Sequence, residues 1–218
     1  MWLRAEAWLR VQAQPPGPDG WDKQALECLQ YWARSDFPLV LTRQRPGRTA
    51  ERAHESLALG LPAPACWERR RFLVEVPAGS VSRVGRFPSA DAITEDLPAR
   101  ARDDWRGLCT ALLRLQIAAL VYGSYGWQQL TGLAYLHPHS DVDLLVVVDT
   151  SSQADAAAAL LLGASFDVPR IDGEIVFGDG AAVPWREWAA WRAGRVERVL
   201  VKRPHGAALE DPRSWAAA

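Results

Sequence analysis

The sequence predicts an α+β protein in which a small α+β domain at residues 1–90 precedes a larger one at residues 91–218. Turn-rich stretches such as QPPGPDG, RPGRTAE and GLPAPA break the first 90 residues into short segments. The later residues instead alternate apolar runs with segments of helical periodicity. Charge divides at the same point, with 13 basic and 9 acidic residues up to residue 90 and 12 and 17 after it. These differences predict two modules.

Two short apolar runs in the first domain, at residues 37–42 and 72–76, predict strands between turns. The stretch GRFPSADAITEDLPAR, at residues 85–100, has the composition of a linker to the second domain. Residues 101–117 predict a helix, because apolar side chains recur there at intervals of three and four. Those side chains are Trp105, Leu108, Leu112 and Leu115.

Strands and helices alternate through the rest of the second domain. Short apolar runs predict strands at residues 118–122, 142–149, 166–172, 173–177 and 196–202. Helices are predicted at residues 123–132, 153–164 and 185–191. We expect the strands on either side of Asp172-Gly173 to form a hairpin, because Asp-Gly is a strong turn signal. Tryptophans at three-residue spacing in the last helix are expected in the core: Trp185, Trp188 and Trp191.

The composition excludes several classes of function. A net charge of −1 lacks the basic excess that nucleic-acid-binding proteins use on phosphates, so we expect no nucleic-acid partner. No apolar run approaches the roughly 20 residues of a membrane span, and MWLRAEAWLR lacks the apolar core of a signal peptide. We therefore expect a cytoplasmic protein with no membrane partner. Cys28, Cys66 and Cys109 are too widely spaced to support a disulfide framework or a zinc site.

Two carboxylates, Asp141 and Asp143, stand at the start of the strongly apolar strand VDLLVVVD. Side chains alternate along a strand, so both acids point to the same face. Like charges this close repel each other, and a divalent metal ion between them relieves the repulsion. The pair therefore predicts a bound cation.

Two further features of the second domain fit chemistry on phosphates. Gly123 and Ser124 stand where a predicted strand gives way to a helix, so backbone N–H groups and the Ser124 hydroxyl can cradle phosphate oxygens. A third acid, Asp172, lies on a later predicted strand, and Glu174 two residues on is the alternative. A phosphate cradle with three carboxylates predicts a two-metal site for phosphoryl or nucleotidyl transfer.

The pattern GS...DVD...RID resembles the signature of the DNA polymerase beta type nucleotidyltransferase superfamily, although the gap between GS and DVD is longer than usual there. The stretch YGSYGWQQLTGLAYLHPHSDVDLL is similar to one branch, the malonate decarboxylase holo-acyl-carrier-protein synthases, also called phosphoribosyl-dephospho-CoA transferases. Weaker similarity extends through PLVLTR, ALGLP, DGEIVF, WREW and VLVKR. The resemblance implies a nucleotidyltransferase-like mixed sheet with flanking helices.

The resemblance also implies a reaction. Members of that branch transfer the prosthetic group from 2'-(5''-triphosphoribosyl)-3'-dephospho-CoA to a serine of the apo acyl-carrier subunit of malonate decarboxylase and release pyrophosphate. Asp141 and Asp143 would hold two Mg²⁺ or Mn²⁺ ions on the triphosphate, because hard cations prefer oxygen ligands. Gly123 and Ser124 would hold the departing pyrophosphate. Asp172 would help to bind metal and accept the proton of the incoming serine.

Two other functions stay open. The chain can be a metal-dependent nucleotidyltransferase that uses ATP on a small molecule or a protein. It can also be an inactive adaptor that keeps the fold, although the presence of all three acids weighs against this. Binding of dephospho-CoA derivatives, compared with binding of ATP, separates the first two functions.

Basic residues add two expectations. Lys202 ends a predicted strand and can reach a phosphate, although a lysine at a strand end is commonly only solvated. Acyl-carrier proteins are generally acidic, so a docking surface for one should be basic. The basic excess of the chain lies in its first domain, and its densest cluster is Arg69, Arg70 and Arg71. This cluster is the candidate docking surface for the carrier, and an ordinary solvated face is the alternative.

Overall fold

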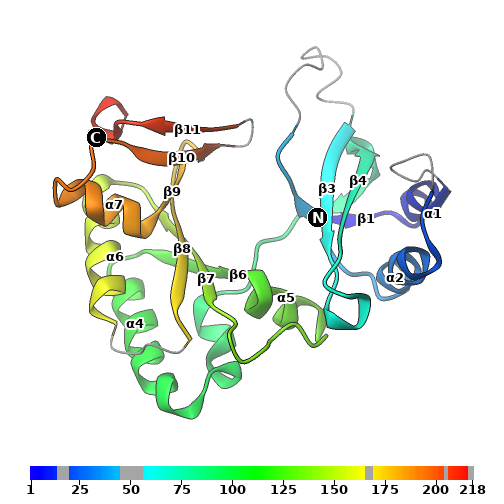
Figure 1. Cartoon of the computed structure of the whole chain (residues 1–218), viewed down its shortest axis with the longest axis horizontal. Coiled ribbons are helices and arrows are strands. Elements are labelled where there is room, and N and C mark those ends of the chain that lie inside the picture. Colours follow the sequence, from blue (N-terminus) through cyan, green and yellow to red (C-terminus); the bar gives the residue numbers. More distant parts are fainter. Residues whose placement is uncertain (14–19, 45–55, 165–168, 204–205, 216–218) are drawn as a thin grey trace. The chain divides into compact units, whose positions relative to one another are not determined.

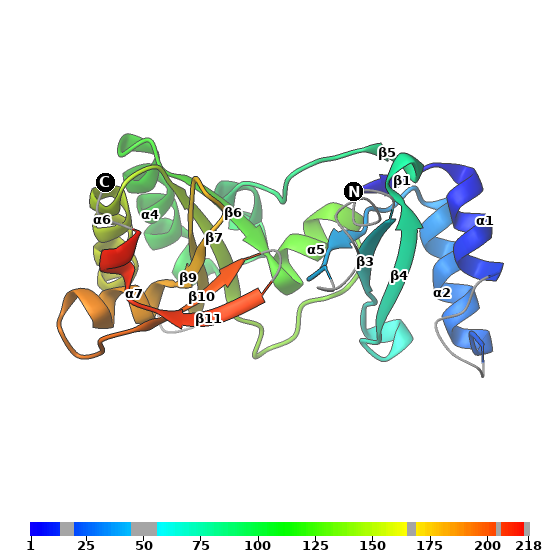
Figure 2. The ribbon, with the colours of Figure 1, turned by 90° about the horizontal axis from the view of Figure 1, so that it is seen from above.

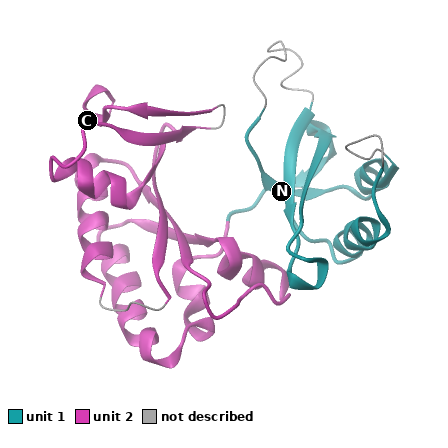
Figure 3. Cartoon of the chain, in the orientation of Figure 1, with its two compact units in different colours: residues 1–86 teal, residues 87–218 magenta. Residues whose placement is uncertain are grey.

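The computed structural model of the chain describes residues 1–13, 20–44, 56–164, 169–203 and 206–215. The chain forms two compact units, residues 1–86 and residues 87–218 (Figures 1 and 3). The expected domain boundary at residue 90 thus lies just inside the second unit. Both units mix helices with sheets, as the sequence predicts. No helix in the described ranges has the length and apolar character needed to span a membrane.

The first unit is built on a three-stranded antiparallel sheet. Its strands, in sheet order, are β2 (Val40–Leu41), β3 (Ser56–Pro62) and β4 (Arg71–Pro77). Helices α1 (Ala5–Ala13) and α2 (Lys23–Arg34) lie together on one face of this sheet (Figure 2). A small second sheet pairs β1 (Trp2–Leu3) with β5 (Val81–Arg83), and two short 3-10 helices follow β3 and β4: η1 (Ala65–Trp67) and η2 (Ala78–Ser80).

Alternation explains how β4 packs. Phe72, Val74 and Val76 are buried, whereas the residues between them are exposed. Period-two alternation of this kind places one face of a strand on a core and the other in solvent. The expected strands at residues 37–42 and 72–76 correspond to β2 and β4, and β3 was not anticipated.

The prediction of a linker at residues 85–100 was wrong. Most of this stretch belongs to the second unit and forms two short 3-10 helices, η3 (Ala90–Asp96) and η4 (Ala99–Ala101). Ile93 and Leu97 are buried, and the Trp105 indole donates a 2.8 Å hydrogen bond to the Ala90 carbonyl. The prolines and charges gave this segment the composition of a loop, while its few apolar side chains anchor it to the core.

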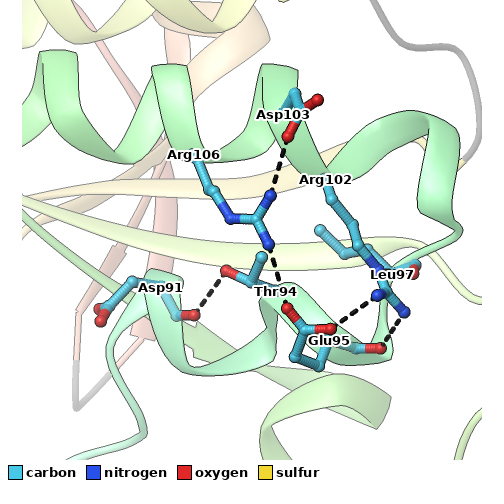
Figure 4. A network of polar contacts seen from close by, with 7 residues as sticks. All are labelled: Asp91, Thr94, Glu95, Leu97, Arg102, Asp103 and Arg106. Atoms are coloured by element: carbon cyan, nitrogen blue, oxygen red, sulfur yellow. Dashed lines mark hydrogen bonds and ion pairs between the residues drawn. The ribbon is translucent and has the colours of Figure 1, made fainter.

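A polar network joins η3 to α4 (Arg102–Arg114), as Figure 4 shows. The Glu95 carboxylate accepts hydrogen bonds from Arg102 at 2.6 Å and from Arg106 at 3.1 Å. Arg106 also donates to Asp103 at 2.8 Å, and Arg102 donates to the Leu97 carbonyl at 3.0 Å. Arg106 therefore bridges two carboxylates on the surface of the unit.

The second unit is built on a six-stranded mixed sheet. Its strands, in sheet order, are β11 (Gly206–Glu210), β10 (Val199–Arg203), β9 (Ala182–Pro184), β8 (Ile171–Phe177), β7 (Val142–Val148) and β6 (Ala118–Tyr122). Strands β7 and β8 are parallel, and the other neighbouring pairs are antiparallel. Strands β9 and β11 were not anticipated from the sequence.

Helices cover one face of this sheet. The parallel strands β7 and β8 are connected through α6 (Ser151–Gly163), which packs on that face with α4 (Figure 1). Helix α7 (Trp185–Arg192) packs against β8, β9 and β10, and the short η5 (Pro212–Ser214) follows β11. Trp185 and Trp188 are buried in this core, as predicted, whereas Trp191 is only partly buried against it. The buried side chains of β7 are Val142, Leu144, Val146 and Val148.

The predicted hairpin at Asp172-Gly173 was also wrong, because β8 runs without a break through both residues. Gly173 lies opposite Leu144 of β7, with a φ of 125°. A Cβ at this position would come within 2.0 Å of the Leu144 carbonyl oxygen. Glycine here permits the two parallel strands to approach each other and does not form a turn. The first part of the predicted strand, residues 166–168, lies outside the described residues.

Candidate active site

Gly123 and Ser124 begin helix α5 (Gly123–Thr131) directly after β6. Gly123 has a φ of 60°, and a Cβ there would lie 1.9 Å from Oδ2 of Asp143. Both the left-handed backbone and the close approach therefore require glycine. The half-buried Ser124 lies in the first turn, and the preceding Tyr122 provides no side-chain cap. The first turn of α5 thus begins beside a carboxylate.

Asp143 lies at the centre of a row of polar side chains that crosses three strands. It pairs with Tyr122 on β6 and with Asp172 on β8, in register on both sides. Residues in register on adjacent strands point to the same face of the sheet. That face is opposite the one that carries the buried Val142 and Leu144, so the row lies on the face that α4 and α6 do not cover.

The pKa of Asp143 is raised to about 6 by burial and by nearby negative charges. Burial of the carboxylate is the largest cause, followed by the neighbouring charges of Asp172, Asp141 and Glu174. Arg170 acts in the opposite direction. A cation that binds among like-charged carboxylates relieves their repulsion, so this arrangement favours cation binding. This is the repulsion that the DVD motif predicts, and Asp172 adds to it.

Arg170 is the residue that sequence reasoning missed. Its Nη2 lies 2.7 Å from Oδ2 of Asp141 and 3.4 Å from Oδ2 of Asp172, and its Nε lies 3.2 Å from the same Asp141 oxygen. One guanidinium therefore bridges two of the three predicted metal ligands. The available signal was its place in RID, because an arginine two residues before an acid on a strand points to the same face.

Glu174 is already engaged by two donors. Tyr122 Oη donates to Glu174 Oε2 at 2.8 Å, and Lys202 Nζ lies 2.6 Å from Oε1. The pKa of Tyr122 is raised, first by burial and then by the charge of Glu174, so the phenol remains a donor. The Glu174 side chain is 13% exposed, compared with 44% for Asp172. Glu174 therefore anchors Lys202, whereas Asp172 lies beside Asp143 and is the more accessible acid.

The chemistry of these side chains fits a hard divalent cation, because carboxylate oxygens are the ligands that Mg²⁺ and Mn²⁺ prefer. Among the described residues, however, no three His, Cys, Asp or Glu side chains are arranged as a ready ligand set. Arg170 contacts Asp141 and Asp172 on the oxygens that such an ion would need. The donors fit the ion in type, and Arg170 occupies Oδ2 of both Asp141 and Asp172.

The two histidines near the motif lie in the turn that precedes Asp141. The backbone N–H of His137 donates to Oγ of Ser140 at 3.0 Å, and that of His139 donates to Nδ1 of His137 at 3.2 Å. His139 is exposed, and Ser140 is buried. These contacts shape the turn that leads into the acidic pair.

Comparisons with known proteins match most of the chain to one family. Residues 1–87 match the family model described as Phosphoribosyl-dephospho-CoA transferase MdcG N-terminal domain, and residues 89–213 match the model of the C-terminal domain. The two matches adjoin where the second compact unit begins. No solved structure matches the chain.

Several similar proteins are also named phosphoribosyl-dephospho-CoA transferase. A phosphoribosyl-dephospho-CoA transferase of Xanthomonas campestris pv. campestris (strain 8004) is 36% identical over 219 residues, which cover 96% of this chain and 91% of the relative. One from Bradyrhizobium diazoefficiens is 33% identical, with 91% of each chain covered. One from Pseudomonas aeruginosa is 38% identical, with 82% of this chain and 80% of the relative covered. The chain therefore belongs to the phosphoribosyl-dephospho-CoA transferase family and is a transferase.

Proposed function

We propose that this transferase moves the phosphoribosyl-dephospho-CoA group from 2'-(5''-triphosphoribosyl)-3'-dephospho-CoA to a serine of the apo acyl-carrier subunit of malonate decarboxylase. The serine oxygen bonds to the α-phosphorus of the triphosphate, and the bond from that phosphorus to the pyrophosphate oxygen breaks. The observation that supports this most is the contact of Gly123 with Asp143, which places the first turn of α5 beside the acidic row.

The first turn of α5 suits the leaving pyrophosphate. The first N–H groups of a helix have no partner within the helix, and the helix dipole favours negative charge at that end. Tyr122 provides no side-chain cap, so Gly123 and Ser124 can present these groups to phosphate oxygens. Donors that are already in place stabilise charge as it develops on the departing oxygen.

The acids have two proposed roles, which are proton acceptance and metal binding. Asp172 accepts the proton of the attacking serine in this proposal, because it is the more accessible acid and lies in register with Asp143. Mg²⁺ or Mn²⁺ held by Asp141, Asp143 and Asp172 would neutralise charge on the triphosphate. The nucleophile belongs to the carrier, which agrees with a site built from acids and a helix terminus.

Lys202 adds a fixed positive charge to the same site. Its ammonium group is held by Glu174, whose other oxygen is held by Tyr122 at the end of β6. A lysine fixed in this way is less free than a solvated one, so it loses less conformational entropy when it binds phosphate. We assign Lys202 to the phosphates of the donor.

The intact mass of the carrier tests this proposal. Apo carrier subunit is incubated with the protein, Mg²⁺ and either the triphosphoribosyl donor or ATP. We expect a mass gain equal to the phosphoribosyl-dephospho-CoA group with the first donor and none with ATP. A gain equal to AMP would support the alternative nucleotidyltransferase. No gain with either donor, while both still bind, would support the inactive adaptor.

A further inference from the structure

We propose that Arg170 is an internal substitute for the divalent ion, which binds Asp141 and Asp172 when the ion is absent and binds donor phosphate when the ion is present. This inference rests on the proposed function, because it concerns the same site. It assigns a role to a residue outside the predicted ligands, and it can be tested without measuring transfer.

The contacts of Arg170 place it in competition with a metal ion. Its Nη2 contacts Oδ2 of both Asp141 and Asp172, at 2.7 Å and 3.4 Å, and its Nε contacts the same Asp141 oxygen at 3.2 Å. A cation coordinated by these acids requires oxygens that the guanidinium now uses. The two cations therefore exclude each other on the oxygens that they share.

The exposure of Arg170 makes this exchange possible. Its side chain is 58% exposed, and ion pairs between exposed side chains are weak in water. Its backbone is fixed, because the Arg170 carbonyl accepts a 2.9 Å hydrogen bond from the Val142 N–H. The guanidinium can thus leave the acids while its Cα stays beside β7. A divalent ion, with twice the charge, competes strongly for the vacated oxygens.

A released Arg170 remains next to the acids that would hold the metal-bound triphosphate. Guanidinium groups bind phosphate through two parallel hydrogen bonds, which makes arginine a preferred phosphate ligand. Lys202, in contrast, remains tied to Glu174. Arg170 would therefore join the donor phosphates only after metal binding, and this would couple the two binding events.

Calorimetric titration of Mn²⁺ into the donor-free protein tests whether Arg170 competes with the divalent ion. The matched control is Arg106→Gln, because Arg106 also bridges two carboxylates, is 52% exposed and lies in the same unit but in a different polar network (Figure 4). We expect Arg170→Gln to bind Mn²⁺ about fivefold more tightly than wild type, since a weak competing ion pair is removed. Arg106→Gln should bind it as wild type does.

Arg170→Lys separates bridging from charge alone. Lysine keeps the charge but lacks the planar fork that contacts both acids. We expect this variant to bind Mn²⁺ about twofold more tightly than wild type, as part of the bridge is lost. Wild-type affinity in Arg170→Lys would contradict bridging, and wild-type affinity in Arg170→Gln would overturn competition with the metal.

Binding of inorganic pyrophosphate in saturating Mg²⁺ tests whether the released Arg170 binds phosphate. We expect Arg170→Gln to weaken it about tenfold and Arg106→Gln to leave it unchanged. Unchanged pyrophosphate binding in Arg170→Gln would overturn the phosphate role. Neither titration uses the carrier, so a failure of group transfer and a failure of this inference are distinguishable. Circular dichroism confirms that each variant is folded.

Discussion

Gly123 approaches the carboxylate of Asp143 so closely that a Cβ on Gly123 would lie 1.9 Å from Oδ2. This contact joins the two halves of the sequence motif, which are 20 residues apart in the chain. It brings the first turn of α5 next to the central acid of the row on β7 and β8. The predicted phosphate cradle and the predicted metal ligands therefore lie side by side.

Replacement of Gly123 by alanine tests this contact. The methyl group would collide with Asp143, and its backbone would keep an unfavourable positive φ, so we expect a loss of about 2 kcal/mol or more in the free energy of unfolding. Transfer should fall below detection. Gly107→Ala is the control, because a Cβ on this α4 residue meets nothing within 4 Å. Chemical denaturation should show that Gly107→Ala equals or exceeds wild type in stability.

Asp143→Asn should stabilise the metal-free protein at pH 8 while it abolishes transfer. The folded-state pKa of Asp143, about 6, exceeds its ordinary value of 3.8. Its contribution to wild-type stability is therefore fully present below pH 3.8 and is lost as pH rises through 6. Asparagine does not ionise, so the variant does not lose this stability as pH rises. Because water partly screens the carboxylate, we expect a gain of about 1 kcal/mol in the free energy of unfolding.

Thermal unfolding in excess chelator from pH 4 to pH 8 measures this effect. The difference in Tm between Asp143→Asn and wild type should grow as pH rises from 4 to 7 and then level off. The exposed Asp149, at the other end of β7, supplies the control Asp149→Asn, which should follow wild type. A constant difference in Tm across the whole pH range would show that ionisation of Asp143 does not destabilise the folded protein.

Asp172 and Glu174 should respond differently to loss of charge. Asp172→Asn removes the proposed proton acceptor, so we expect kcat to fall about 100-fold or more. Glu174→Gln loosens Lys202 and should mainly raise the KM for the donor, by about tenfold. Steady-state kinetics with varied donor separates the two effects. A larger fall in kcat for Glu174→Gln than for Asp172→Asn would reverse our assignment of the third acid.

The three arginines of the candidate docking surface differ in their contacts. Arg70 is paired with Asp22 at 2.7 Å and lies over the Phe72 ring, whereas Arg69 and Arg71 are exposed. We expect Arg69→Glu combined with Arg71→Glu to slow carrier association about tenfold at low salt and to leave donor binding unchanged. The association rate of this double variant should also depend less on salt, because fewer charges steer the encounter. Stopped-flow association rates across a salt series measure both effects.

Equal rates and equal salt slopes for wild type and the double variant would exclude this surface from carrier docking. The control is Arg4→Glu combined with Arg10→Glu, which makes the same change in charge at exposed positions of the same unit. This control should leave the association rate closer to that of wild type. An equal effect of both double variants would indicate net charge rather than a defined surface.

Local patterns in the sequence predicted much of the second unit. A strongly apolar run predicted β7, and the change from strand to helix at Gly123 predicted α5. Both features are set by residues close together in the chain. The same local cues failed at Gly173, where a turn signal proved to be a close approach between strands, and at residues 85–100.

Contacts that depend on the register between distant strands were not predictable. Glu174 is 52 residues from Tyr122 and 28 residues from Lys202, and only the order of the strands brings them together. Arg170 reaches Asp141 across 29 residues for the same reason. Arg170 and Lys202 each resemble a solvated surface charge in the sequence. Their roles emerge from the pairing of β7 with β8 and from the order of β6 to β10.

The intact mass of the apo carrier subunit, after incubation with donor and Mg²⁺, tests the central claim most directly when wild type is compared with Asp143→Ala. We expect wild type to add the phosphoribosyl-dephospho-CoA group and to release one pyrophosphate per carrier, and we expect excess chelator to stop both. Folded Asp143→Ala should add nothing, because it lacks the central acid of the row. Equal mass gains from wild type and Asp143→Ala, or a wild-type gain that persists in chelator, would contradict the account.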